Sequence, residues 1–142
     1  MYGIVLVRSV PVLNRIICLP SKFTIIISFS IVSLPKITKL LSKFLRICML
    51  DFNGKTLLQR QIQAYNDCGV KNITVIRGYK KEKINYKNIK YFDNTDFKNN
   101  NVLNSIFYAE KVINGNIIIS YSDILFDSVT VKRLLNSDHD IS

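Results

Sequence analysis

Cysteine and histidine are scarce in this sequence, and their scarcity limits the kinds of site it can build. The 142 residues include three cysteines, Cys18, Cys48 and Cys68, and one histidine, His139. An odd number of cysteines without metal-ligand spacing argues against a disulfide framework and against a Cys/His zinc site. We therefore expect the protein to work in a reducing compartment, the cytoplasm.

Long hydrophobic runs are also lacking. The longest near the start, Phe23 to Val32, lies between Lys22 and Lys36 and is far shorter than the roughly 20 residues that span a bilayer. Arg8 and Arg15 interrupt the segment before it, which makes a signal peptide a poor match. The sequence therefore predicts no membrane span.

Acidic residues are missing from the first third of the chain. Residues 1 to 50 contain seven Lys or Arg and no Asp or Glu, whereas residues 51 to 142 contain thirteen basic and ten acidic residues. Most of the formal net charge of +10 thus belongs to the N-terminal segment. The small remaining excess is a weak signal for a polyanion, so we expect no nucleic-acid partner, and a basic nucleic-acid binder is only a minor alternative.

Glycine is absent between Gly3 and Gly54, where a phosphate-binding loop would be needed. Such a loop requires glycines so that backbone N–H groups can approach the phosphates. If the sheet begins at residues 23 to 27, its first loop falls at residues 28 to 34, which contain no glycine. As written, this loop is unsuited to binding phosphate.

What the sequence does contain is the composition of a globular domain, with 48% hydrophobic and 21% charged residues. Its length fits one domain. Residues 1 to 22 are broken by Pro11 and Pro20 and show no sustained period, so we treat them as an atypical N-terminal segment without an assigned function. The domain proper is expected at residues 23 to 142.

Apolar patterns from residue 23 onward predict an alternation of strands and helices. Strands are expected at 23–27, 72–77 and 89–92, from 116 to about Asp123, and at 138–141; a turn of helix is expected at 80–84. This alternation is typical of an α/β fold with a doubly wound, mostly parallel sheet.

Three amphipathic helices are expected between these strands, each with its apolar residues facing the core. Those residues are Leu57, Leu58, Ile62 and Tyr65 in the first helix, Leu103, Ile106 and Phe107 in the second, and Val129, Leu134 and Leu135 in the third. The pattern places Gly69 just after the end of the first helix and Asp127 at the N-cap of the third.

Asp123 stands where the most apolar strand should end, after the run Ile117 to Ile119. In an open α/β sheet, ligands bind at the carboxyl ends of the strands, so a carboxylate there can hold a divalent metal or a ligand hydroxyl. A carboxylate at this point can equally cap a turn. The pattern alone leaves both interpretations open.

Four blocks of this sequence, in their order and spacing, resemble the sugar-phosphate nucleotidyltransferases, and within them the MobA-like and choline-phosphate cytidylyltransferase branch. The blocks are Cys48 to Ile62, Gly69 to Tyr79, Asn104 to Ala109 and Tyr121 to Phe126. The resemblance implies a Rossmann-like nucleotide-binding fold. It also implies transfer of a nucleoside monophosphate, CMP from CTP in this branch, to a phosphorylated sugar or alcohol of cell-surface polysaccharide synthesis, with release of pyrophosphate.

The resemblance also implies roles for five residues. Asp123 matches the catalytic aspartate that binds Mg²⁺ and the nucleotide phosphates. Asn104 and Ser105 match a polar pair that opens a helix near the nucleotide and substrate, and Gly78 matches a glycine close to the base. Lys43 is the candidate for the lysine that normally precedes the Cys-Met-Leu block.

The sequence departs from the family pattern near its start. Ser30 and Val32 occupy glycine positions of the family's first loop, and no Pro-Lys pair directly precedes Cys48. The family's second metal-binding aspartate would fall beyond Ser142. We therefore interpret residues 23 to 142 as a partial nucleotidyltransferase domain, incomplete at its C-terminus, with exposed apolar surface that favours a homo-oligomer.

Two functions from different classes remain. The first is an NTP-dependent nucleotidyltransferase that uses Mg²⁺. The second is a catalytically inactive fragment or binding module that keeps the same fold. Exchange of radioactive pyrophosphate into each NTP separates the two, because only an active enzyme catalyses it.

Overall fold

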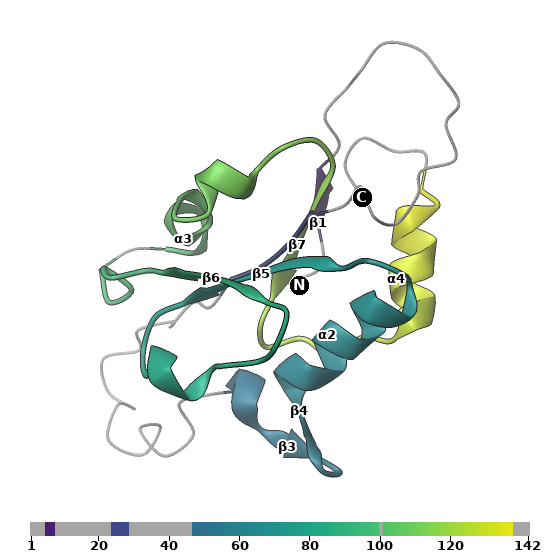
Figure 1. The fold of residues 1–142 in the computed structure, drawn as a ribbon, viewed down its shortest axis with the longest axis horizontal. Coiled ribbons are helices and arrows are strands. Elements are labelled where there is room, and N and C mark those ends of the chain that lie inside the picture. Colours follow the sequence, from purple (N-terminus) through teal and green to yellow (C-terminus); the bar gives the residue numbers. More distant parts are fainter. Residues whose placement is uncertain (1–4, 8–23, 29–46, 100, 138–142) are drawn as a thin grey trace.

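A sheet of five strands forms the centre of the computed structural model, which describes residues 5–7, 24–28, 47–99 and 101–137. Figure 1 shows helices on both sides of this sheet. The strands are β1 (Val5–Val7), β2 (Thr24–Ser28), β5 (Asn72–Arg77), β6 (Lys90–Asp93) and β7 (Ile117–Tyr121), in the spatial order β1-β7-β2-β5-β6.

Four of these strands are parallel. β2 pairs with β5 on one side and with β7 on the other, and β6 extends the sheet beyond β5. Counted along the chain, the parallel strands lie in the order 3-2-1-4, which is the order of the first four strands of a Rossmann fold. The predicted α/β fold with a doubly wound, mostly parallel sheet is therefore confirmed.

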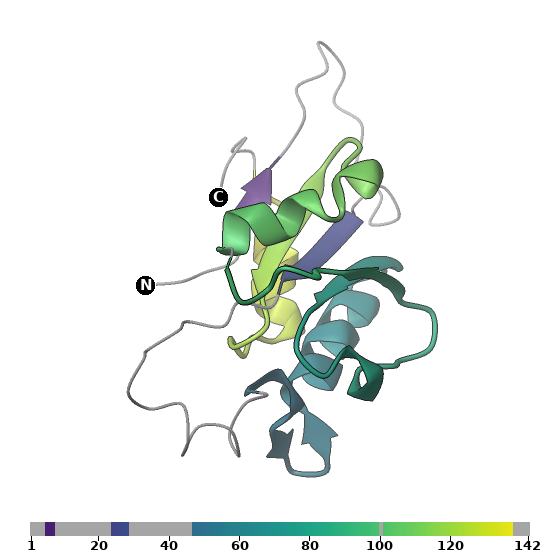
Figure 2. The ribbon, with the colours of Figure 1, turned by 90° about the vertical axis from the view of Figure 1, so that its left-hand side faces the viewer.

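β1 is the exception, because it pairs antiparallel with β7 at the edge of the sheet. Figure 2 shows β1 (purple) and β2 (blue) on the two sides of β7. No element was expected in residues 1 to 22, so β1 is an addition to the predicted sheet. The rest of that segment lies outside the described residues, as do the loop at 29–34, Lys43, His139 and the strand expected at 138–141.

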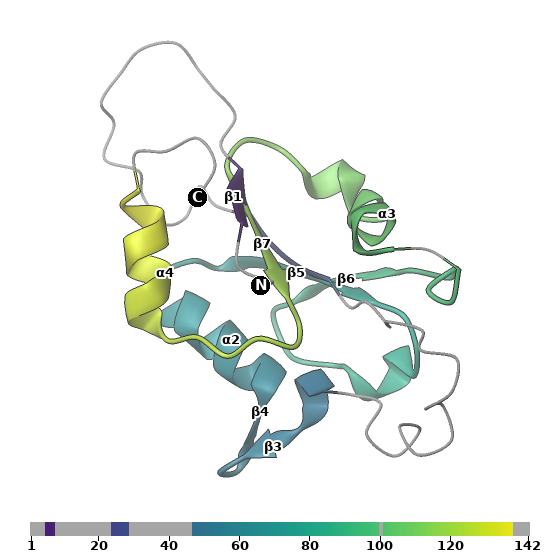
Figure 3. The ribbon, with the colours of Figure 1, turned by 180° about the vertical axis from the view of Figure 1, so that it is seen from behind.

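The sheet is covered by α2 (Leu57–Asp67) and α4 (Ser128–Leu135) on one face and by α3 (Val102–Phe107) on the other, as Figure 3 shows from behind. Alternation along the strands divides the core between the two faces. Ile25, Ile27 and Ile118 pack on the side of α2, while Ile26 packs on the side of α3. All four of these isoleucines are fully buried, as expected for central strands with helices on both faces.

Helix α2 has clear signals at both ends. At its start, the Thr56 hydroxyl accepts from Gln59 N–H and the Gln59 side chain accepts from Thr56 N–H, which forms a capping box. At its end, Cys68 is the C-cap and Gly69 has φ +79°, as the sequence predicted. A hairpin of β3 (Asp51–Phe52) and β4 (Lys55–Thr56) precedes the helix.

Helices α3 and α4 form where they were predicted, but part of their predicted buried faces is wrong. Leu103 and Phe107 of α3 are 62% and 58% exposed, whereas Ile106 is buried as predicted and is joined in the core by Ala109, just after the helix. In α4, Val129 is 51% exposed and Val131 is fully buried. Both helices are short, so a rotation of one residue step changes which apolar side chains face the sheet without breaking the pattern.

Three 3-10 turns complete the described chain. They are η2 (Ile47–Met49), η3 (Lys81–Lys83) after β5, and η4 (Glu110–Val112) after α3. The helical turn expected at residues 80 to 84 is therefore present as η3. Lys80 precedes it with a left-handed backbone at φ 52°.

Candidate functional site

The carboxyl ends of the four parallel strands meet along one edge of the sheet. From β2 the chain leads outward to β5 and β6, and then returns to the other side of β2 as β7. This reversal makes the gap between the ends of β2 and β7 the topological switch point, where ligands bind in open α/β sheets. Asp123 follows the last residue of β7, Tyr121, by two positions and so lies beside that point.

The side chain of Asp123 is exposed, whereas Ser122 before it is buried. Within the described part of the chain, no side-chain hydrogen bond or ion pair of Asp123 is seen. Asp127 shows the contrast, because its carboxylate caps α4 by accepting from Thr130 N–H at 2.9 Å. Asp123 thus has an exposed carboxylate that no described cation neutralises.

The turn that holds Asp123 is tied to helix α2 by a buried amide. Gln61 is fully buried, and its Nε2 donates to the carbonyl oxygens of Tyr121 at 2.9 Å and of Ile124 at 2.6 Å. These two carbonyls stand on either side of Asp123 in the chain. The sequence analysis missed Gln61, although a polar residue among the buried positions Leu57, Leu58 and Ala64 was a signal for it.

The predicted pair at the start of α3 separates into two environments. Asn104 is exposed, and its N–H is capped by the Asn101 side chain at 2.9 Å. Ser105 is buried; its hydroxyl accepts from the Asn94 amide at 2.8 Å and donates to the Asn101 carbonyl at 3.1 Å. Asn104 can therefore reach a ligand, while Ser105 and Asn94 join the start of α3 to the end of β6.

Gly78 directly follows β5, at the same edge of the sheet. A Cβ added there would lie 2.8 Å from the Cβ of Phe97, so the close approach of the loop after β6 requires glycine. Phe97 in turn contacts the ring of Tyr79, with a centroid separation of 6.1 Å. Two strand spacings, about 10 Å, separate the end of β5 from the end of β7 and hence Gly78 from the Asp123 side of the edge.

A charged cluster that the sequence analysis missed lies at the carboxyl ends of β5 and β6. Arg77 and Lys81 each lie 2.9 Å from the carboxylate of Asp93, and the Arg77 guanidinium stacks 4.2 Å from the Tyr91 ring centroid. Partial burial raises the pKa of Asp93, but hydrogen bonds from Lys81 and Arg77 outweigh it and hold the pKa below its ordinary value. The cluster fastens β5, β6 and η3 together.

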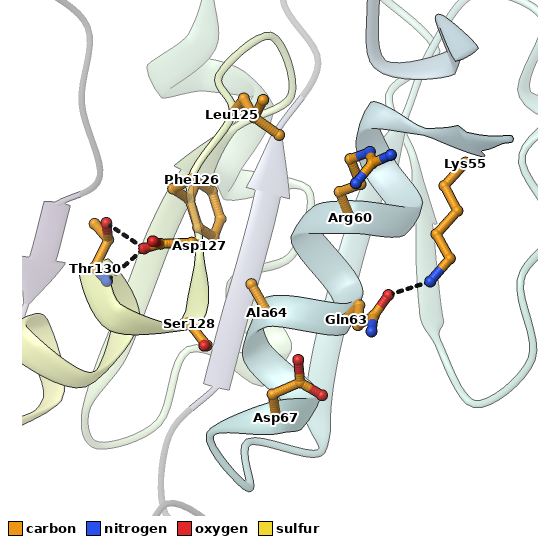
Figure 4. A pocket seen from close by; sticks show the side chains of 10 residues that line it. All are labelled: Lys55, Arg60, Gln63, Ala64, Asp67, Leu125, Phe126, Asp127, Ser128 and Thr130. Atoms are coloured by element: carbon orange, nitrogen blue, oxygen red, sulfur yellow. Dashed lines mark hydrogen bonds between the residues drawn. The ribbon is translucent and has the colours of Figure 1, made fainter. Parts of the chain in front are cut away.

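A groove of about 690 Å³ lies elsewhere, between the outer side of α2 and the start of α4. Figure 4 shows Lys55, Arg60 and Asp67 on one wall and Leu125 and Asp127 on the other. None of the predicted site residues Gly78, Asn104, Ser105 and Asp123 lines it. The groove thus begins at Leu125, two residues after Asp123, but the predicted site residues do not line it.

No group of three or more His, Cys, Asp or Glu side chains within the described ranges is placed to hold a metal ion. A divalent cation at Asp123 would therefore be completed by other oxygen ligands, such as backbone carbonyls, residues outside those ranges, water or a bound substrate. Mg²⁺ suits such a site, because it commonly binds through one or two carboxylates, substrate phosphates and several waters.

These features define an α/β protein whose candidate ligand-binding site lies at the carboxyl ends of a parallel sheet. The sequence is distantly similar to a CTP:phosphoglutamine cytidylyltransferase of Campylobacter jejuni, with 27% identity over 107 residues. The match covers 67% of this chain and 42% of that relative, so the chain spans less than half the relative's length. No family model matches the sequence.

The similarity to a cytidylyltransferase agrees with the resemblance to nucleotidyltransferases found in the sequence. The agreement is at the level of the class, nucleotidyltransferases, and does not extend to the substrate or the pathway. Among the described helices, none is both long and apolar enough to cross a membrane.

Proposed function

We propose that this chain belongs to a nucleotidyltransferase that transfers CMP from CTP to the phosphate of a small acceptor and releases pyrophosphate. The observation that supports this most directly is the exposed carboxylate of Asp123, which forms no ion pair within the described residues and lies beside the switch point of a Rossmann-like sheet. The distant similarity to a CTP-dependent enzyme supports CTP as the donor.

The acceptor is proposed to be a phosphorylated sugar or alcohol of cell-surface polysaccharide synthesis. The relative's name specifies phosphoglutamine for that enzyme. Both kinds of acceptor present a phosphate monoester or related phosphate as the nucleophile. A phosphate oxygen of the acceptor attacks the α-phosphorus of CTP, the bond to the bridging oxygen breaks, and pyrophosphate leaves.

Asp123 would hold Mg²⁺ together with phosphate oxygens and water. When bound, the metal neutralises charge on the phosphates as pyrophosphate leaves. The protein's own part is to position the reactants along the edge of the sheet. Asn104 offers an exposed amide near the start of α3. Gly78, proposed to lie close to the base, directly follows β5 with Phe97 packed against it.

Lys43 is proposed as a cationic group for the phosphates and lies outside the described residues. The alternative of a catalytically inactive binding module rests on the lack of glycine at residues 28 to 34. Without glycines, backbone N–H groups approach phosphates poorly, which would leave binding weak and the chemistry slow.

Exchange of radiolabelled pyrophosphate into CTP, ATP, GTP and UTP tests the proposal. We expect Mg²⁺-dependent exchange in the presence of the phosphorylated acceptor or its CMP adduct, with CTP as the preferred nucleotide. Omission of Mg²⁺ is the control. Binding of Mg·CTP by calorimetry without any exchange would support the inactive binding module instead.

A further inference from the structure

The buried amide of Gln61 connects the candidate metal ligand to the rigid part of the fold. Gln61 lies on α2 among the buried residues Leu58, Ala64 and Tyr65, so its main chain is fixed by core packing and by the capping box at the helix start. A polar side chain in such a position costs free energy unless its donors and acceptors are hydrogen-bonded, and within the described residues the buried Oε1 of Gln61 has no partner. Both donors of this amide are used on the Asp123 turn.

The two hydrogen bonds fix the turn on both sides of the carboxylate. Tyr121 is the last residue of β7 and Ile124 follows Asp123, so one amide group holds the chain immediately before and after Ser122–Asp123. Because both acceptors are carbonyl oxygens, only the NH₂ end of the amide can face them. The orientation of Gln61 is therefore set by the turn itself.

Helix α2 also contacts the chain after the Asp123 turn at two points, Phe126 and Ser128. The ring of Tyr65 meets that of Phe126 edge to face at 5.3 Å, and the Cys68 thiol donates to the Ser128 carbonyl at 3.3 Å. Both contacts are farther along the chain from Asp123. Gln61 is thus the described side chain of α2 that constrains the backbone directly beside the carboxylate.

We propose that Gln61 is a positioning residue for Asp123, which sets the direction of its carboxylate toward a divalent cation and the phosphates of a nucleotide. The proposal rests on the proposed function, in which Asp123 holds that cation. Residues that orient a metal ligand typically change metal affinity about 10- to 100-fold when they are replaced.

The test compares Gln61→Met with Asp123→Asn and with Leu58→Val in the full chain. Gln61→Met keeps the length of the side chain and removes both donors. Leu58→Val, at an equally buried position one turn earlier, is the control for a general loss of packing. Affinity for Mn²⁺ in the presence of CTP is measured by electron paramagnetic resonance, and hydrogen exchange is followed at the amides of residues 122 to 125.

We expect Gln61→Met to weaken Mn²⁺ binding about 10- to 100-fold and to speed exchange at these amides. Leu58→Val should keep the parental affinity even where it lowers the melting temperature. If Gln61→Met binds as the parent does while Asp123→Asn does not, the positioning role is wrong and the proposed function stands. If the parent itself does not bind, or Asp123→Asn binds equally well, the proposed function is wrong.

Gln61→Glu provides a second variant of nearly the same shape if Gln61→Met does not fold. Burial raises the pKa of an introduced carboxyl, and its neutral form regains one O–H donor toward the turn. Its Mn²⁺ affinity relative to the parent should therefore improve as the pH is lowered. If the ratio of the Mn²⁺ affinity of Gln61→Glu to that of the parent stays constant across the pH range, the donor has no role.

Discussion

At the scale of single residues, Asp123 and Asp127 offer a matched pair of exposed carboxylates four positions apart. Replacing Asp123 by Ala should abolish Mg²⁺-dependent binding of CTP, because the proposed metal loses its protein ligand. The free energy of unfolding should change by no more than about 0.5 kcal/mol, since the side chain is exposed and away from the core. Calorimetry with Mg·CTP and thermal unfolding measure the two effects.

Asp127→Ala is the control for this experiment, because it should change stability and leave CTP binding unchanged. It removes the N-cap of α4, where the carboxylate accepts from both the N–H and the hydroxyl of Thr130. We expect a lower melting temperature and an unchanged affinity for Mg·CTP. Equal affinity of the parent and Asp123→Ala would exclude Asp123 as the metal ligand.

Asp93 is expected to contribute to the loss of folding stability at acid pH. Its pKa in the folded protein lies below the ordinary carboxyl value, because the hydrogen bonds from Lys81 and Arg77 outweigh the effect of partial burial. Such a group stabilises the fold above its unfolded-state pKa, and that stability is lost as the pH falls through the folded-state pKa. Asp93→Asn should therefore reduce the loss of stability in acid.

The size of the effect is limited because the ion pairs are partly exposed, and we expect about 1 kcal/mol or less. Urea unfolding of the parent and of Asp93→Asn across the acid range measures it. Glu110→Gln, at an exposed residue of η4, serves as the comparison. Parallel stability curves for the parent and Asp93→Asn would show that the Arg77–Asp93–Lys81 cluster adds no acid-sensitive stability.

At the scale of elements, Gly78 decides how closely β5 and the loop after β6 approach each other. Gly78→Ala places a methyl group 2.8 Å from the Cβ of Phe97, which is too close without a shift of the loop. We expect a loss of about 1 to 3 kcal/mol in the free energy of unfolding. Thermal or urea unfolding measures it.

A double-mutant cycle with Phe97→Gly separates this clash from other effects of the substitution. Removing the Cβ and ring of Phe97 should make Gly78→Ala much less destabilising, because the contact then has no partner. Equal cost of Gly78→Ala with and without Phe97 would place the strain somewhere other than at this contact.

Much of this element structure could be predicted because its signals are local. The glycine at residue 69 marked the end of α2 in the sequence, and the capping box of Thr56 and Gln59, which the sequence analysis did not name, is an equally local signal for its start. The apolar strands can likewise be predicted from the sequence, because they are short runs of apolar residues. The errors at Leu103, Phe107 and Val129 arose because α3 and α4 are too short for periodicity to fix their rotation.

The candidate site was predicted less completely, because its supporting contacts join distant parts of the chain. Asp123 was proposed as a site residue from its place at the end of an apolar strand. Gln61 was missed because its partners, Tyr121 and Ile124, lie some sixty positions later. The Arg77–Asp93 pair likewise depends on the register of β5 and β6, which no local pattern states.

At the scale of the whole molecule, the alternation of strands and helices along the chain predicts the fold class. It does not predict the order of the strands in the sheet. A series of strands in sequence is equally compatible with several orders in space. The distant similarity to a cytidylyltransferase supports the class. The homo-oligomer, the cytoplasmic location and the division of the chain at residue 22 stay predictions.

The position of β2 between β5 and β7 also affects how the protein is made in the cell. Ile25 pairs with Ile73 on one side and with Ile118 on the other, so both neighbours of this strand emerge from the ribosome long after it. Parallel pairing across such separations is slow, because a long loop must close before any contact is gained. Until β7 has been synthesised, an isoleucine-rich strand stays without its final partners, and we expect the nascent chain to depend on chaperones that shield it.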